Sequence, residues 1–195
     1  VDTDEDANRE AYSPTHSMWV GDESKGDGEY DDNWDFSLYT AQNISLGTTP
    51  SMSVNLWYSV ENSWDGGNVQ ISTDGGGSWS VIDPDGGYPD DAIVGLDNEP
   101  GYTATSGEGD VADWETATFD LTDYANEDVK FRFRFGTDSS VNGYEGWYID
   151  DFEVNNGGAS TFEDDFDDGD SNWEADLVRS EWNYYDVDEE YGKAY

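Results

Sequence analysis

The chain has 195 residues, a length that suits a single domain, and it carries 47 Asp and Glu against seven Lys and Arg, for a net charge of −40. Because contacts to phosphate require basic side chains, this balance excludes nucleic acid as a partner. The chain has no long apolar run, so we expect no membrane insertion. It also has no cysteine, which excludes disulfides, thiolate catalysis and cysteine-ligated metals.

The acidic residues are spread along the whole chain, and lysine occurs only at Lys25, Lys130 and Lys193. Repulsion among so many negative charges opposes the compact state, whereas at molar salt a Debye length of about 3 Å screens it. This composition is typical of halophilic proteins; the alternative is an acidic secreted protein with calcium as its counter-ion. The nine Trp, 13 Tyr and eight Phe can supply the core.

Short alternating or aromatic-rich runs recur between clusters of Gly, Asp, Asn and Pro, and helical periodicity is nearly absent. This pattern predicts an all-β sandwich. In chain order, the predicted strands of its main part are Phe36–Thr40, Met52–Val60, Asn68–Thr73, Ser78–Ile82, Ala92–Leu96, Trp114–Leu121, Val129–Phe135 and Trp147–Val154.

The run Phe131–Phe135 alternates strictly between Phe and Arg, so we expect three Phe to face a core and two Arg to face the other way. Turn signals such as Asp65-Gly66-Gly67 and Asp74–Gly77 separate the strands. The long, polar and Gly-rich stretch Asp97–Asp113 predicts a surface loop.

A Gly- and Asn-rich linker is predicted at residues 155–161. Residues 1–154 before it form the predicted sandwich. Residues 162–195 after it are again strand-like, as expected where a next domain begins. The strands predicted there are Phe162–Asp170, Trp173–Arg179 and Glu181–Asp188.

The last segment of the chain repeats part of its beginning. Asp186–Tyr195 matches Asp2–Tyr12 when a gap of one residue is allowed, and Tyr12 and Tyr195 are 183 residues apart. A period of domain size suggests a tandem array of such units. The alternative is a chance agreement between two acidic stretches in a very acidic protein.

Four segments together resemble the MAM-like jelly-roll domain on the C-terminal side of immune inhibitor A-type secreted metallopeptidases. They are SPTHSMW at Ser13–Trp19, WDGGNVQISTDGG at Trp64–Gly76, Ser78-Trp79, and GWYIDDFEV at Gly146–Val154. The resemblance implies a two-sheet antiparallel jelly-roll β-sandwich, secreted or at the cell surface. It also implies a domain that is not an enzyme, because the family's peptidase activity belongs to a different domain.

In that family an acidic-aromatic strand precedes the Ser-Pro-Thr-His segment, and here such a strand occurs instead at Phe162–Asp170. The resemblance therefore implies a sandwich that lacks its first strand, followed by the first strand of another copy. A donated strand would fill this place in a neighbouring copy and build a filament head to tail. The residues expected to insert are Phe162, Phe166, Trp173 and Leu177. The linker is also as short as a hairpin loop, so pairing within one chain stays open.

Catalysis has little support in the sequence. His16 is the only histidine, which excludes a two-histidine zinc site, and we interpret it as a structural residue of the Ser-Pro-Thr-His segment. Carboxylate pairs suitable for a glycosidase will occur by accident among 47 acidic residues.

Calcium is the expected cofactor, in a structural role, because clustered Asp residues with Gly turns supply the oxygen ligands that it prefers. The alternative is a solvated acidic face. The predicted ligands are Asp164, Asp165, Asp167, Asp168 and Asp170, joined by Asp150 and Asp151 if the two strands lie side by side.

Carbohydrate binding is the alternative function, as in an accessory domain that binds polysaccharide or substrate beside a secreted hydrolase. Trp57, Trp64, Trp79 and Trp147 could present rings to sugars, although aromatic residues on strands more often belong to the core. Asn43 begins the one glycosylation sequon, Asn43-Ile44-Ser45. The favoured function is a structural module that assembles with copies of itself.

Overall fold

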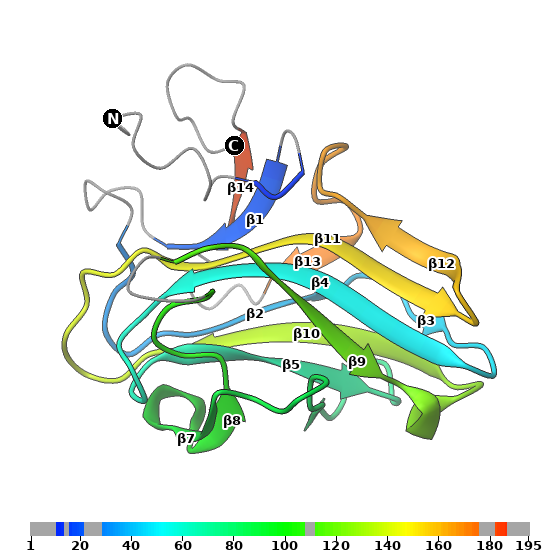
Figure 1. Cartoon of the computed structure of the whole chain (residues 1–195), viewed down its shortest axis with the longest axis horizontal. Coiled ribbons are helices and arrows are strands. Elements are labelled where there is room, and N and C mark those ends of the chain that lie inside the picture. Colours follow the sequence, from blue (N-terminus) through cyan, green and yellow to red (C-terminus); the bar gives the residue numbers. More distant parts are fainter. Residues whose placement is uncertain (1–10, 14–15, 22–28, 108–111, 176–181, 187–195) are drawn as a thin grey trace.

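Two β-sheets face each other across the core of the domain (Figure 1). The computed structural model describes residues 11–13, 16–21, 29–107, 112–175 and 182–186. The first sheet contains, in spatial order, β14 (Trp182–Asp186), β1 (His16–Val20), β11 (Gly146–Asn156), β4 (Pro50–Ser59) and β9 (Glu115–Asp120), and β12 (Ala159–Asp164) also pairs with β11. The second contains β13 (Trp173–Ala175), β2 (Asp35–Thr40), β10 (Asp128–Gly136), β5 (Gly66–Ser72) and β6 (Ser80–Val81), with β3 (Ile44–Ser45) also beside β10.

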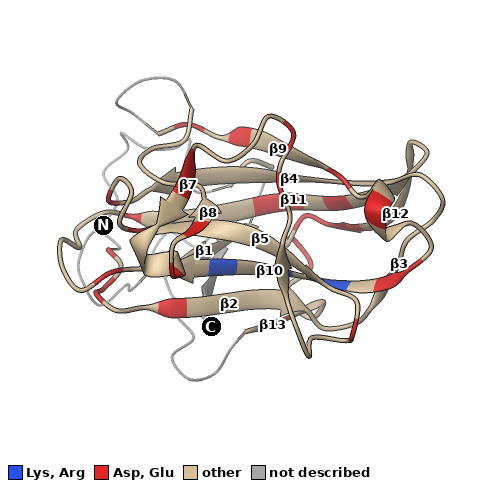
Figure 2. Ribbon diagram, turned by 90° about the horizontal axis from the view of Figure 1, so that it is seen from below, with Lys and Arg blue, Asp and Glu red and all other residues tan. Residues whose placement is uncertain are grey.

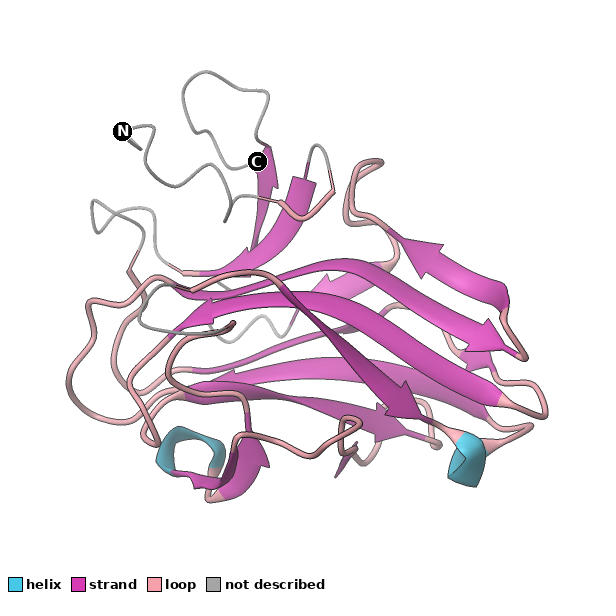
Figure 3. Ribbon diagram, viewed as in Figure 1, coloured by secondary structure: helices cyan, strands magenta, loops and turns pink. Residues whose placement is uncertain are grey.

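Helix is confined to short turns in the described part of the chain, as Figure 3 shows. These are the 3-10 turns η2 (Val94–Leu96) and η3 (Thr122–Tyr124), and a separate ribbon pairs β7 (Asp90–Ile93) with β8 (Glu99–Gly101). Every strand pairing among the described residues is antiparallel. The predicted all-β antiparallel sandwich is confirmed.

Strand β10 carries the alternation expected from its sequence. Phe131, Phe133 and Phe135 are fully buried between the sheets, whereas Arg132 and Arg134 lie on the outer face. Phe133 packs edge-on against Trp147 and Phe152 of the facing sheet, with ring centroids 5.9 and 6.0 Å apart. The aromatic residues therefore supply the core of this acidic chain.

Strand β11 changes its alternation at a bulge. Trp147 and Ile149 are buried before it, and Phe152 and Val154 are buried after it. The pairing with β4 shifts between Asp150 and Glu153, and Asp151 has a positive φ of 47°. The extra residue turns the strand so that both halves keep apolar side chains in the core.

One edge of β11 is shared by two strands that follow each other along it. β1 pairs with residues 147–149 and β12 with residues 152–156. The bulge with Asp150 and Asp151 lies between them. The same arrangement occurs on β10, where β2 and β3 follow each other along one edge.

Residues 155–161, which the sequence predicts as a linker, contain the ends of β11 and β12 and a two-residue turn between them. Gly157 and Gly158 form this turn with φ of 62° and 84°, the left-handed backbone that a tight hairpin of this kind requires. In this structure β12 pairs with β11 of its own chain, and β13 pairs with β2. Most of the two repeated segments, residues 2–10 and 187–195, lies outside the described residues.

Three local expectations from the sequence are wrong. The segment Ala92–Leu96 is divided between the end of β7 and the turn η2. The expected loop Asp97–Asp113 contains β8, which pairs with β7. No strand was expected at β1, whose residues are buried between β11 and β14. Among the described residues, no helix is long and apolar enough to cross a membrane.

We predict that Trp173→Ala destabilises the fold by about 3–5 kcal/mol, because the ring fills the core beside Phe152 and Phe166. Trp173→Phe should cost about 1–3 kcal/mol, since it keeps a ring but removes the Nε1–H bond to Asp164 Oδ2 (3.0 Å). Urea unfolding at molar salt measures both. Equal stability of wild type and the alanine variant would contradict the packing of β13 described above.

Candidate functional site

Every basic residue in the described part of the chain lies on one strand. Lys130, Arg132 and Arg134 alternate along β10 with the buried Phe residues, and Figure 2 shows their positions in blue on that ribbon. The remaining four, Arg9, Lys25, Arg179 and Lys193, lie outside the described residues. The basic residues of the described part of the chain therefore lie together on the outer face of the second sheet.

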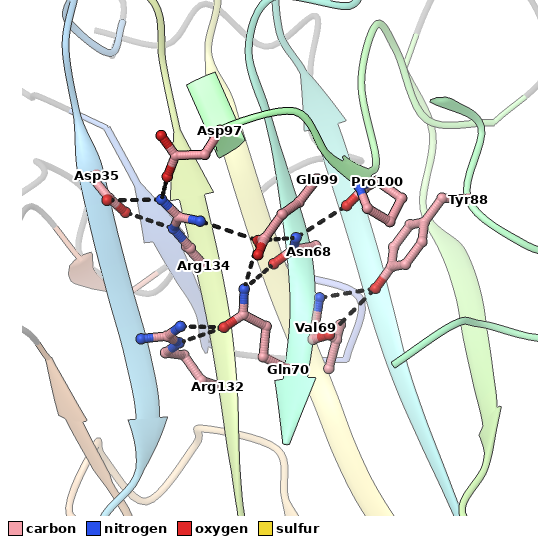
Figure 4. Close-up of polar contacts among 10 residues, drawn as sticks. All are labelled: Asp35, Asn68, Val69, Gln70, Tyr88, Asp97, Glu99, Pro100, Arg132 and Arg134. Atoms are coloured by element: carbon pink, nitrogen blue, oxygen red, sulfur yellow. Dashed lines mark hydrogen bonds and ion pairs between the residues drawn. The ribbon is translucent and has the colours of Figure 1, made fainter. Parts of the chain in front are cut away.

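Arg134 is held by three carboxylates (Figure 4). Its Nε and Nη2 donate to the two oxygens of Asp35 at 2.8 and 2.9 Å, Nη2 also donates to Asp97 at 2.7 Å, and Nη1 donates to Glu99 at 3.1 Å. The guanidinium is largely buried, whereas its partners are more exposed. The hydrogen bonds with Asp35, followed by those with Asp97 and the charges, raise the pKa of Arg134 despite burial.

Glu99 extends this network onto β5. Its Oε2 accepts hydrogen bonds from the side-chain amides of Asn68 (3.3 Å) and Gln70 (3.1 Å). The Gln70 carbonyl oxygen in turn accepts from Arg132, with Nε at 3.0 Å. The outer face of β5 and β10 is thus cross-linked to the β7–β8 ribbon, as Figure 4 shows.

Two aromatic rings lie beside these cations. The Arg132 guanidinium lies 4.7 Å from the centroid of the Trp79 ring, and the Lys130 ammonium lies 5.5 Å from that of Tyr39. The Tyr39 and Trp79 rings are 6.1 Å apart, and both are half-buried. We call Tyr39, Trp79, Lys130 and Arg132 the cation–aromatic face.

A different group of charges lies at one end of the sandwich. Carboxylate oxygens of Glu61, Asp65 and Asp138 all lie within 4.8 Å of one another, and we call these residues the carboxylate trio. Asp65 is only 1% exposed. Its burial raises its pKa to about 6, although hydrogen bonds from Tyr30 and the Asp138 backbone oppose the shift.

Asp150 and Asp151, predicted as calcium ligands, lie at the bulge of β11. Asp150 is fully buried, and its Oδ2 accepts the backbone N–H groups of Tyr12 (2.8 Å) and Ser13 (3.0 Å). Burial raises the pKa of Asp150 to about 7 against these hydrogen bonds. Asp151 accepts from Ser13 Oγ (2.9 Å) and Asn55 Nδ2 (3.1 Å). Both carboxylates therefore hold the segment before β1 against β11.

The remaining predicted ligands lie at the end of β12 and in the turn after it. Asp164 accepts from Phe166 N (2.9 Å), Asn172 Nδ2 (2.8 Å) and Trp173 Nε1 (3.0 Å), which fixes the turn into β13. A second carboxylate, Asp167, accepts the His16 backbone N–H at 3.1 Å. Asp165, Asp168 and Asp170 are exposed.

Four of the seven predicted ligands line one acidic cavity of about 600 Å³, namely Asp151, Asp164, Asp165 and Asp168. The structure does not bring Asp150, Asp167 and Asp170 into that lining. Among the described residues, the carboxylate trio has three ligand atoms within 4.8 Å of one another, and these seven residues have no such group. Calcium binding at the seven carboxylates stays a prediction.

Three of the four residues predicted to exchange strands are described, and they pack in or against the core of their own chain. Phe166 is fully buried and Trp173 nearly so, and half-buried Phe162 packs against Phe152 at 5.9 Å. Leu177 lies outside the described residues. The structure thus shows the pairing within one chain; exchange between copies stays a prediction.

The four tryptophans considered for sugar binding have different surroundings. Trp147 is fully buried in the core, and Trp57 is buried in a row with Tyr148 and Trp19 on the outer face of the first sheet. Trp64 is 48% exposed, and Trp79 belongs to the cation–aromatic face. Of the four, these last two can contact a ligand.

Asn43, the predicted glycosylation site, is exposed between β2 and β3. It lines a pocket of about 260 Å³ together with Thr40, Phe162 and Asn172, among others. A glycan at this position stays a prediction.

A model of the family described as immune inhibitor A-like, MAM domain, matches residues 25–179. The chain belongs to this family. The expected resemblance is confirmed, and the matched range of the MAM domain runs past Val154 to take in β12 and β13. No curated protein matches the chain.

MAM domains of this family are non-catalytic accessory domains of secreted proteases. His16, the first residue of β1, contacts the Asp167 carboxylate: its backbone N–H donates to Oδ1 at 3.1 Å, and its ring Nδ1 lies 3.4 Å from the same oxygen. A structural role for His16 stays a prediction.

Sequence reasoning missed the carboxylate trio and the partners of Arg134. Glu61 and Asp65 lie four residues apart in one turn, which is a detectable signal. Asp138 joins them from 73 residues beyond Asp65, in the loop after β10. Asp35, Asp97 and Glu99 are likewise distant from Arg134 in the sequence. Only the pairing of the strands brings these residues together.

We predict that Arg134→Met destabilises the domain by about 2 kcal/mol, a value below that of a fully buried ion pair because the three acidic partners are partly exposed. Arg134→Lys should recover little of this loss, since a compact ammonium cannot reproduce the bidentate pair with Asp35 together with the bonds to Asp97 and Glu99. Urea unfolding compares them with Lys130→Met, a matched control expected to lose less than about 1 kcal/mol. Equal losses in the two methionine variants would contradict the special role of Arg134.

Proposed function

We propose that this MAM domain is an extracellular, non-catalytic accessory module that binds polysaccharide on the cation–aromatic face. The observation that carries the proposal is the gathering of the described basic residues beside two half-buried rings on one sheet face. Such a face places apolar ring surface and directional donors next to each other, as ligand sites commonly do.

The chemistry of the face suits a saccharide. Ring faces of Tyr39 and Trp79 can pack against the C–H face of a sugar, and amide and cationic groups can bond its hydroxyls. At molar salt, which screens repulsion from the rest of this strongly acidic domain, Lys130 and Arg132 can also pair with the carboxylate groups of an acidic saccharide. A binding role of this kind brings a secreted protease close to a polymeric surface.

We predict that Trp79→Ala weakens retention on insoluble polysaccharides by about tenfold, the effect typical of removing an aromatic anchor from an interface. Retention is measured by pull-down at molar salt, which screens non-specific repulsion of the acidic domain. Trp64→Ala is the matched control, because this residue is exposed and lies outside the cation–aromatic face. Unchanged retention of the Trp79 variant would contradict binding on the cation–aromatic face. Loss of retention in the Trp64 variant alone would place the binding site at Trp64 instead.

Strand exchange between copies at a cell surface is the second candidate function. One observation favours it: β13 pairs with β2 through only three residue pairs, yet β13 and the turn before it supply Trp173 and Phe166 to the core. The same contacts could form with a neighbouring copy if the Gly157-Gly158 turn opened.

The absence of native cysteine allows a direct test of this exchange. Glu153 and Glu163 are paired across β11 and β12, so a Glu153→Cys, Glu163→Cys variant should form a disulfide wherever these strands meet. Exchange predicts covalent ladders on a non-reducing gel when the variant is oxidised at high concentration. Monomers alone, with thiols consumed, would show that the strands pair only within one chain.

A further inference from the structure

The sequence contains two Asn-Gly dipeptides, Asn142-Gly143 and Asn156-Gly157. In such a pair the backbone nitrogen of Gly can attack the side-chain amide carbon of Asn. A C–N bond forms, ammonia leaves, and water opens the resulting succinimide ring to give aspartate or isoaspartate. Glycine favours this step because it has no Cβ and its backbone adopts conformations that other residues reach only at a cost. The reaction also requires that neither reacting group be held by the fold.

Both reacting groups of Asn156-Gly157 are held by Thr49. The Asn156 side chain accepts the Thr49 backbone N–H at 2.9 Å through Oδ1, and the Gly157 N–H donates to the Thr49 carbonyl oxygen at 3.0 Å. Asn156 is also the last residue of β11, where it pairs with Ala159 and Pro50. Attack at this dipeptide therefore requires the hairpin to open first.

The other dipeptide, Asn142-Gly143, lies in the loop between β10 and β11, at the left in Figure 1. Both residues are exposed and belong to no strand or helix. Within the described part of the chain, no group accepts a hydrogen bond from the Gly143 N–H. The preceding residue, Val141, has a φ of 66°, a costly backbone for a β-branched side chain, so the loop loses little when it changes conformation. Gly143 can therefore bring its nitrogen to the Asn142 amide while the sandwich stays folded.

The Asn142 side chain connects its loop to two acidic residues. Its Nδ2 donates to Oδ1 of Asp31 at 3.1 Å and to Oδ1 of Asp32 at 2.9 Å, shortly before β2. Both bonds are exposed to solvent, so water competes for the amide and they restrain it only weakly. Conversion of the amide to a carboxylate would remove the donor and bring a third negative charge up to these two.

We propose that Asn142 deamidates in the folded domain, whereas Asn156 is protected by its hairpin. The product is a carboxylate that repels Asp31 and Asp32 and adds to the negative charge of a very acidic domain. The site thus undergoes a slow, irreversible change of charge that needs no enzyme and no reactant besides water.

The consequence for the fold is local, because other hydrogen bonds also join the β10–β11 loop to the segment before β2. The Thr137 hydroxyl donates to the Asp31 carbonyl oxygen at 2.8 Å, and the Tyr30 N–H donates to the Tyr144 carbonyl oxygen at 3.2 Å. Neither bond involves the Asn142 side chain. Deamidation should therefore loosen one end of the sandwich without opening its core.

The test is incubation of the folded protein at mildly alkaline pH and molar KCl, followed by peptide mapping with mass spectrometry that separates aspartate from isoaspartate. Asn142 should convert at least about tenfold faster than Asn156, because a hydrogen-bonded hairpin opens only rarely. In guanidinium chloride, which unfolds the chain, the two sites should convert at similar rates. Asn142→Gln is the matched control and should stay unconverted at this position, since its longer side chain would have to close a larger ring.

Conversion of Asn142 well ahead of Asn156 in the folded protein supports the proposal. Conversion of Asn156 as fast as that of Asn142, or faster, would overturn it. Conversion of neither site in the folded protein, with conversion of both in guanidinium chloride, would also overturn it, because the loop would then shield Asn142.

The charge effect is tested by comparing Asn142→Asp with Asn142→Ala, which loses the donor without adding charge. At the lowest salt concentration at which wild type folds, the aspartate variant should have a Tm about 2–4 °C below that of the alanine variant. At molar salt the difference should shrink, because the Debye length falls to about 3 Å. Equal Tm values of the two variants at low salt would overturn the proposed repulsion by Asp31 and Asp32.

Discussion

The strict alternation of β10 is the constraint on which this domain depends. Because successive side chains point to opposite faces, the same nine residues place three Phe in the core and three basic residues on the outer face. The strand also pairs with β2, β3 and β5, so its position sets the register of most of the second sheet. Core packing and surface chemistry are therefore fixed together, and a shift of one residue would exchange them.

The acidic composition imposes a second requirement, which is that carboxylates removed from water must receive donors. Asp150 accepts backbone N–H groups ahead of β1, and Asp164 accepts an N–H, an amide and an indole at the turn into β13. In both places the carboxylate ties a distant segment to the sandwich. Acidic residues thus act as connectors here, and Glu61 stands apart because one of its buried oxygens has no donor.

Local patterns in the sequence predicted the features that depend on neighbouring residues. The Phe–Arg alternation gave the orientation of β10, the aromatic runs gave most strands of both sheets, and the motif around Trp147 led to the correct family. β1 was missed because its five residues are all buried, so no alternation marks them. The partners of Arg134 and the carboxylate trio could not be predicted, since they depend on which strands become neighbours. The turn at Gly157-Gly158 shows the same limit: its residues fit a linker and a tight hairpin equally, and pairing decides between them.

The pairing of β1 with β14 also determines how the domain would respond to mechanical tension. The strands are antiparallel, with His16 opposite Asp186 and Val20 opposite Trp182. The start of β1 and the end of β14 therefore lie at the same end of the ladder. A force that pulls the two ends of the chain apart would act on one end of this strand pair. Its hydrogen bonds would then break one after another, rather than all at once as in shear. This pair would peel first, while the β4–β11 and β5–β10 ladders carry little load. Tethered within a longer chain, the domain would lengthen at low force with its core still closed.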